Sequence, residues 1–265
     1  MTELRSSRVP AWVAFVGIGL ASGLMSGLFG VGGGTVIVPL LVLLASFDQR
    51  LASGTSLAAI VPTALVGVVT YAVMGEVAWV AALLLAAGAV VGAQIGTWLL
   101  PKLPIPVLRW GFVAFLVVVI INLFLVVPSR DAVLDITLGT GIGLLVAGLV
   151  TGILSGLLGV GGGVIVVPVL ILLFGASDLI AKGTSLLMMI PTALSGTLGN
   201  LRRHNVDLKA GLFIGLGACV STAFGAQLAQ LLDPKVATPL FAIFLTFIAI
   251  QLVLKARKAA KSAKA

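Results

Sequence analysis

The sequence predicts an all-α fold, a polytopic transmembrane helical bundle of two inverted homologous repeats, each with a broken helix at a GVGGG cluster. Three observations predict it. Hydrophobic residues make up 60% of the chain and charged residues only 9%. Long apolar segments recur from Trp12 to Leu254. The second half of the chain repeats the first at a constant offset, and both halves carry the glycine cluster.

The composition excludes most classes of soluble protein. A soluble globular chain carries about 25% charged residues, which cover its water-facing surface, and this chain carries far fewer. A helix that crosses the bilayer needs about 20 mostly apolar residues, and several segments reach that length. The net charge of +8 lies mainly in short loops and the C-terminal tail, a distribution typical of membrane proteins. We therefore expect no nucleic-acid partner.

The chain offers little for metal or cofactor chemistry. Its one cysteine, Cys219, lies in an apolar segment, and its one histidine, His204, lies in a basic loop. A single thiol forms no intrachain disulfide and builds no cysteine metal cluster. We therefore expect neither a cofactor nor a metal site.

An internal repeat with an offset of 129 residues organises the chain. The segment from Gly23 to Leu44, GLMSGLFGVGGGTVIVPLLVLL, aligns with GILSGLLGVGGGVIVVPVLILL, and 14 of the 22 positions are identical. The same offset aligns two GTSL motifs and two PTAL motifs. We predict a first transmembrane repeat at residues 1–129, a second at 130–258 and a basic cytoplasmic tail at 259–265.

Each half contains five apolar segments, of which the second is short. An α-helix rises about 1.5 Å per residue, so about 12 residues fall short of the bilayer core. Each short segment follows a glycine cluster and resembles half of a broken hairpin, which either spans the membrane or re-enters it. The segments are 11–29, 35–47, 53–74, 77–100 and 107–127 in the first half, and 137–158, 164–175, 182–201, 206–230 and 236–254 in the second.

The basic residues predict the orientation in the membrane. If the first segment crosses the membrane and the second crosses back, thirteen basic residues lie on one side. Three lie in loops on the other: Arg130, Lys182 and Lys235. If the two segments instead form one broken crossing, eleven basic residues lie on one side and five on the other, which fits the positive-inside rule less well. The first arrangement predicts an inner (cell) membrane protein with both termini cytoplasmic. Five crossings also invert the second half, as in many secondary transporters, whereas four would give parallel repeats.

The two GVGGG clusters indicate a binding site. Glycines cost roughly 1 kcal/mol each in a helix, and unwound backbone in a membrane is tolerated where it is buried in protein or lines a polar cavity. A half-helix after each cluster presents N–H donors and a partial positive charge, which favour an anion. The alternative is that the glycines serve only close helix crossings. The candidate residues are Gly32, Gly33, Gly34 and Thr35, with Gly161, Gly162 and Gly163.

Hydroxyl groups in the GTSL motifs are further candidates. Thr55 and Ser56 in the first motif, and Thr184 and Ser185 in the second, either donate to the anion or only cap helices. We expect the anion between the two glycine breaks near the midplane, held by backbone N–H groups and by these hydroxyls. Alternating access would then expose it to each side in turn.

Differences between the halves suggest one more candidate. Asn200 aligns with Tyr71, and a transporter needs such asymmetry for substrate orientation or ion coupling. No basic residue falls within the core of a predicted span, and the carboxylates fall in loops or at span edges. A proton relay through an intramembrane acid is therefore not expected, and the coupling ion, Na+ or H+, is left open.

The doubled motif GxGGGxxxxP, from Gly30 to Pro39 and from Gly159 to Pro168, is followed in each half by GTSL and PTAL. In this the chain resembles the sulfite exporter TauE/SafE family, also called the toluene-sulfonate uptake permease family. The resemblance covers nearly the whole chain. It implies a membrane transporter of small sulfur-containing anions, such as sulfite, sulfoacetate or another organosulfonate, with the direction not specified.

Other functions compete with this one. An anion channel could use the same helix ends, and a transporter of a different small organic anion fits the same pattern. An intramembrane enzyme would need a base near Ser26 or Ser155, and no histidine falls in a span, so we predict no enzyme. A receptor or structural subunit does not need two polar breaks. The expected partners are the anion, the lipid bilayer and the coupling ion, with a homodimer left open.

Overall fold

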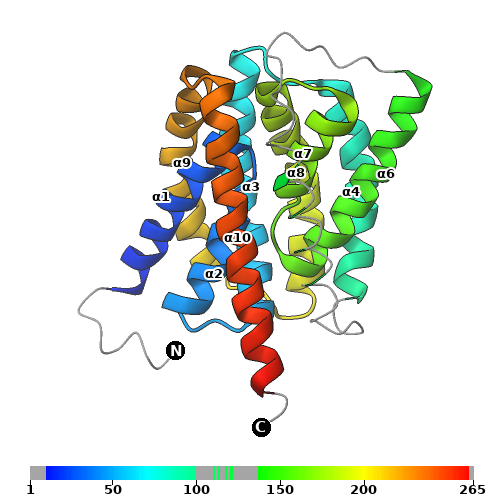
Figure 1. Cartoon of the computed structure of the whole chain (residues 1–265). Coiled ribbons are helices and arrows are strands. Elements are labelled where there is room, and N and C mark those ends of the chain that lie inside the picture. The colour runs from blue at the N-terminus through cyan, green and yellow to red at the C-terminus, as the bar shows by residue number, and fades with distance from the viewer. Residues whose placement is uncertain are drawn as a thin grey trace.

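The computed structural model describes residues 10–99, 110, 113, 117, 120, 121 and 137–262, and over these residues the chain is helical with short connections and no strand. Six of the described helices are long and apolar enough to cross a membrane. The all-α, multi-pass class is thereby confirmed. The helices in Figure 1 are α1 (Ala11–Phe29), α2 (Gly34–Leu44), α3 (Gln49–Val73), α4 (Trp79–Leu99), α6 (Leu138–Leu158), α7 (Gly163–Phe174), α8 (Asp178–Leu201), α9 (Leu208–Leu231) and α10 (Pro234–Ser262).

Some expectations lie outside the described residues. The fifth segment of the first half, 107–127, is described at only five positions, and the chain ends, 1–9 and 263–265, are not described. The division between the repeats at 129 falls outside as well. The domain boundaries and the side of the membrane on which the termini lie therefore stay predictions.

The short helices α2 and α7 are those that the glycine clusters predicted. They contain 11 and 12 residues, so each is less than about 20 Å long. Each follows a long helix that ends at the cluster, because Gly30 and Gly159 adopt left-handed backbone conformations with φ of 69° and 70°. The broken helices are thus confirmed.

Local capping sets the starts of α3 and α8. The carboxylate of Asp48 accepts hydrogen bonds from two backbone N–H groups of the first turn of α3, at 2.8 and 3.0 Å. The hydroxyl of Ser177 accepts one at the start of α8, at 3.2 Å. Such caps satisfy N–H groups that have no partner inside the helix. Both helices therefore begin four residues before the predicted starts at 53 and 182.

The most extensive helix packing joins the two halves of the chain: α1 packs along α9, and α4 packs along α6. Glycines make both approaches close. A Cβ atom on Gly23 of α1 would lie 2.6 Å from the Cα of Ala218, and one on Gly152 of α6 would lie 2.7 Å from the Cα of Ala89. Glycine faces of this kind let membrane helices approach to backbone contact.

The two crossings are reciprocal. Gly23 and Gly152 are separated by the repeat offset, and so are Ala89 and Ala218. Reciprocal contacts of this kind are those of two units related by a two-fold axis. Between the crossings, α3 packs against both α8 and α9, and α8 packs against α4. Each repeat thus completes its packing with helices of the other repeat.

Candidate functional site

The two glycine breaks contact each other through their backbones. A Cβ atom on Gly34, the first residue of α2, would lie 2.8 Å from the carbonyl oxygen of Val160. One on Gly163, the first residue of α7, would lie 2.6 Å from the carbonyl oxygen of Gly30. No side chain fits at either position. The structure therefore brings the two predicted clusters together, with the half-helix starts at their junction.

The N-termini of both half-helices lack side-chain caps. The N-cap residues, Gly33 and Gly162, have φ of 76° and 88°, which an L side chain rarely adopts, and neither can offer a side-chain acceptor. The first N–H groups of a helix have no partner within it, and they carry a partial positive charge. The junction thus offers two sets of backbone donors of the kind that bind anions.

Unpartnered hydroxyls lie beside these N-termini. Ser26, in the last turn of α1, and Thr35, in the first turn of α2, are buried without a hydrogen-bond partner among the described residues. The same holds for Thr151 and Ser155 of α6. A Cβ atom on Gly162 would lie 2.6 Å from the Cγ2 of Thr151 and 3.8 Å from the Cβ of Ser155. An unmade hydrogen bond costs about 1–3 kcal/mol, so a ligand or water at the junction would stabilise these buried hydroxyls.

The two predicted threonines of the GTSL motifs form hydrogen bonds at the starts of neighbouring helices. The hydroxyl oxygen of Thr55 accepts a hydrogen bond from the backbone N–H of Asp207 at 2.9 Å, just before α9. That of Thr184 accepts one from the backbone N–H of Ala78 at 3.0 Å, just before α4. The two bonds are equivalent under the repeat offset. These bonds agree with the alternative in which the two threonines only cap helices.

The two serines of the GTSL motifs differ. Ser185 donates a hydrogen bond to the carbonyl oxygen of Gly30 at 3.0 Å, and so fastens the first break to α8. Ser56 is fully buried, and its hydroxyl has no partner in the described part of the chain. Of the pair, Ser56 therefore has the unused donor that an anion could take.

Asn200 is not brought to the breaks. It follows Met189, which packs on the breaks, by 11 residues, or about 16 Å along α8. Its side-chain nitrogen donates to the carbonyl oxygen of Gly196 at 2.9 Å, whereas its side-chain oxygen is buried and unpartnered within the described ranges. Its equivalent, Tyr71, donates to the carbonyl oxygen of Gly27 at 2.7 Å.

Two apolar side chains that the sequence reasoning missed lie against the breaks. A Cβ atom on Gly32 would collide with Met189 of α8, and one on Gly161 would collide with Met189 and lie 2.8 Å from the Cδ1 of Ile60 of α3. Both side chains are fully buried. They are equivalent under the repeat offset, and each lies between the GTSL and PTAL motifs of its half. That shared position is the signal by which they could have been found.

A buried ion pair overturns one expectation. Lys182 was expected in a loop. That expectation is wrong, because α8 begins at Asp178 and Lys182 lies one turn inside it. The Nζ of Lys182 lies 3.0 Å from the Oδ2 of Asp178, and both residues are 3% exposed. The capped, earlier start of α8 brings the pair into the helix.

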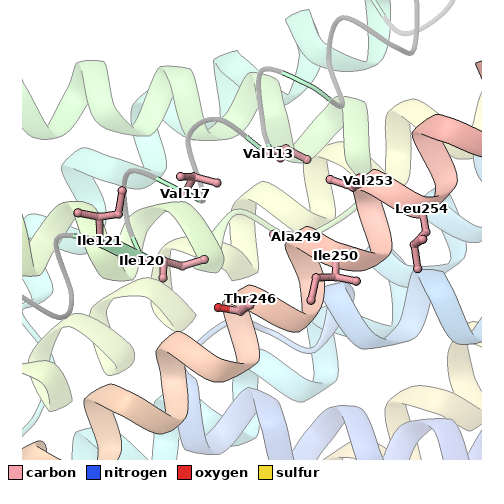
Figure 2. Close-up of a pocket in the computed structure, with 9 residues that line it drawn as sticks. All are labelled: Val113, Val117, Ile120, Ile121, Thr246, Ala249, Ile250, Val253 and Leu254. Carbon is pink, nitrogen blue, oxygen red and sulfur yellow. The ribbon is translucent and has the colours of Figure 1, made fainter.

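Figure 2 shows an apolar groove elsewhere, between α10 and the described residues from Val113 to Ile121. Its volume is about 410 Å³. The hydroxyl of Thr246, the one polar side chain among the described residues that line it, already donates to the carbonyl oxygen of Ala242 at 2.8 Å. These described residues offer no free donor to an anion, so the junction of the breaks remains the candidate site.

Comparisons with known proteins agree with this architecture. Residues 2–123 and 144–265 match the family model described as Sulfite exporter TauE/SafE. The probable membrane transporter protein YdhB of Bacillus subtilis (strain 168) is 29% identical over 228 residues, 84% of this chain and 92% of that protein. The probable membrane transporter protein YunE of the same strain is 36% identical over 121 residues, 43% of this chain and 44% of that protein. No solved structure matches.

Proposed function

Because this chain belongs to the sulfite exporter TauE/SafE family, and is thus a multi-pass membrane transporter, we propose that it carries a small sulfur-containing anion, such as sulfite or an organosulfonate. The anion sits at the junction of the two GVGGG breaks, near the middle of the bundle. The observation that carries the proposal is the meeting of two uncapped half-helix starts beside buried, unpartnered hydroxyls.

The chemistry of the junction suits an anion of this kind. Sulfite and sulfonate groups present several oxygens, each of which accepts a hydrogen bond. Backbone N–H groups of the two half-helices, together with the hydroxyls of Thr35 and Ser155, supply donors from both repeats. Two helix N-termini supply a positive potential at the contact.

The reciprocal packing supports alternating access. If the two repeats are inverted, rocking of one set of interleaved helices against the other opens the junction to each side in turn. Ile60 and Met189 move with α3 and α8, and their side chains close the junction between openings. A carrier of this kind exchanges anions across a closed state, whereas a channel conducts them.

Exchange in proteoliposomes tests the proposal. Vesicles loaded with unlabelled sulfite or methanesulfonate are diluted into a trace of the labelled anion, and transient accumulation inside is measured. We expect saturable accumulation with the purified protein alone. A conductance without exchange would favour a channel, and the absence of exchange for both anions would overturn the proposed substrate class.

Two isosteric variants test the site. Thr35→Val and Ser155→Ala remove one unpartnered hydroxyl each. We expect each to raise the half-saturation concentration for exchange by about 10- to 100-fold, since a lost donor to an anion is worth about 1.5–3 kcal/mol. Thr246→Val is the matched control, because the Thr246 hydroxyl is bonded within α10. Unchanged exchange by both site variants would remove the anion from the junction.

A further inference from the structure

The ion pair in α8 is not explained by stability. The side chains of Lys182 and Asp178 are only 4% and 5% exposed, and the second carboxylate oxygen of Asp178, Oδ1, is buried without a hydrogen-bond partner in the described residues. Replacing a buried ion pair by apolar residues is often neutral or stabilising. Charged residues within membrane spans are costly, and they mark paths for ions and substrates. The pair therefore points to a function in transport.

The pair lies directly behind the first glycine break. A Cβ atom on Gly30 would lie 2.5, 2.7 and 3.0 Å from the Cα, Cβ and Cγ of Lys182. Lys182 also precedes Met189, which packs on both breaks, by seven residues, or about 10 Å of helix. The four-carbon stem of a lysine is flexible, and the contact with Gly30 places the base of this stem at the first break. We therefore take an anion at the first break as a second partner for Lys182.

The second break has the same packing without the charges. Ser53 occupies the position equivalent to Lys182 and packs against Gly159 as Lys182 packs against Gly30. Its hydroxyl donates to the carbonyl oxygen of Leu158 at 3.1 Å. The position equivalent to Asp178 is Gln49. A neutral residue, Ser53, thus packs against the glycine break in one half. The charges of Lys182 and Asp178 are therefore not needed for the equivalent packing in the other half.

Other titratable groups face the pair from α3 and the turn that follows it. Tyr71 of α3 is fully buried and lies within electrostatic range of both Asp178 and Glu76. The turn that carries Glu76 packs against Gly183, next to Lys182. The hydroxyl proton of Tyr71 is already donated to Gly27, so it does not neutralise Asp178. Lys182 is thus the ammonium that compensates Asp178, in a neighbourhood with two further acidic groups.

We propose that Asp178 and Lys182 form a proton-coupling site, through which one proton crosses the membrane with each anion. Without anion, Lys182 neutralises the ionised Asp178. When an anion reaches the first break, a proton from the same solution binds to Oδ1 of Asp178, and the ammonium of Lys182 turns toward the anion. After the anion leaves on the other side, Asp178 releases its proton there and pairs with Lys182 again. Asp178, Lys182 and the anion together carry no net charge at either stage.

The inference rests on the proposed anion transport, and one experiment separates the two. Exchange of labelled methanesulfonate in proteoliposomes needs no net proton movement and reports transport alone; sulfite serves as the second probe, with protein-free vesicles subtracted. Uphill accumulation driven by an imposed pH gradient reports coupling. A gradient of one pH unit corresponds to about 1.4 kcal/mol, so one proton per monovalent anion gives about tenfold accumulation at equilibrium.

Asp178→Asn mimics the protonated state, so we expect it to exchange methanesulfonate but to show no accumulation driven by pH. The double variant Asp178→Asn with Lys182→Gln removes both charges, and we expect weaker exchange and again no pH-driven accumulation; it replaces the single variant if that one does not fold. Ser53→Ala, at the equivalent position of the other repeat, is the control and should keep tenfold accumulation.

The outcomes are distinct. Tenfold accumulation by Asp178→Asn, or loss of accumulation in Ser53→Ala as well, would overturn the coupling site. Wild-type exchange without any pH-driven accumulation would overturn it too, and would leave anion transport standing. No exchange by the wild-type protein would overturn the proposed function, and this inference with it.

Discussion

The hydroxyl of Ser185 in α8 donates a hydrogen bond to the carbonyl oxygen of Gly30, at 3.0 Å, and so ties a helix of the second repeat to the break of the first. The equivalent hydroxyl, on Ser56, is buried without a partner among the described residues. Two residues at the same place in the repeat thus have different tasks. Ser185 fixes the backbone of the break, and we propose that Ser56 donates to the anion.

Substitution by alanine should separate these tasks. Ser185→Ala leaves the carbonyl oxygen of Gly30 without its donor, so we expect a free energy of unfolding lower by about 1 kcal/mol. Ser56→Ala breaks no hydrogen bond, and we expect unchanged stability with weaker anion exchange. Thermal unfolding in detergent and exchange in proteoliposomes measure the two effects. Equal loss of stability in both variants would contradict the assignment.

The threonine caps give a second prediction. Thr55→Val and Thr184→Val each remove the acceptor of one backbone N–H group, at the starts of α9 and α4. Because the two bonds are equivalent, we expect similar losses of stability, about 1–2 kcal/mol each, with exchange per folded molecule retained. The check is the unfolding midpoint beside the exchange rate. Loss of exchange at unchanged stability would instead mean that these hydroxyls touch the anion.

The helix crossing between α1 and α9 gives a third prediction. Gly23→Ala places a Cβ atom against the backbone of Ala218, and we expect a loss of about 1–3 kcal/mol as the helices are forced apart. Gly17, also in α1, has open space at its Cβ position, so Gly17→Ala should raise stability by about 0.5–1 kcal/mol. Comparing how much of each variant stays monodisperse after heating in detergent measures the difference. The same sign for both changes would argue against the crossing.

The inverted arrangement gives a fourth prediction. Gly75 and Arg202 are exposed in the turns after α3 and α8, which are equivalent helices of the two repeats. In a Cys219→Ala background, we expect Gly75→Cys to react with a membrane-impermeant maleimide in intact cells. Arg202→Cys should react only after the cells are permeabilised. Reaction of both from the same side would mean parallel repeats.

The elements that the sequence predicts well are those whose cause is local. Three consecutive glycines strongly disfavour a helix, so the breaks and the short helices α2 and α7 could be located from the residues alone. The starts of α3 and α8 could not be located from hydropathy, because a charged residue ends an apolar segment even where the helix continues. Asp48 and Ser177 carried the missing signal, since both residue types cap helices.

The parts of the site that depend on distant partners could not be predicted. The burial of Lys182 results from its contact with Gly30, which lies 152 residues earlier in the chain. Ile60 and Met189 are apolar residues in apolar helices, and such residues are most often ordinary core. Only the contacts of these two side chains with Gly32 and Gly161 show that they cover the junction. Likewise, the partner of Thr55 lies at the start of a helix of the other repeat.

The reciprocal crossings of α1 with α9 and of α6 with α4 constrain how the chain is made. The glycine face of α1 leaves the ribosome early, whereas its partner α9 follows only after almost the whole chain has been translated. During that interval Gly23 contacts lipid or the insertion machinery, and neither packs against its backbone as closely as Ala218 does. The first repeat therefore completes its packing only after the second has been translated. In a chain truncated before α9, the glycine face of α1 has no partner helix, and we expect quality-control proteases to degrade such a chain.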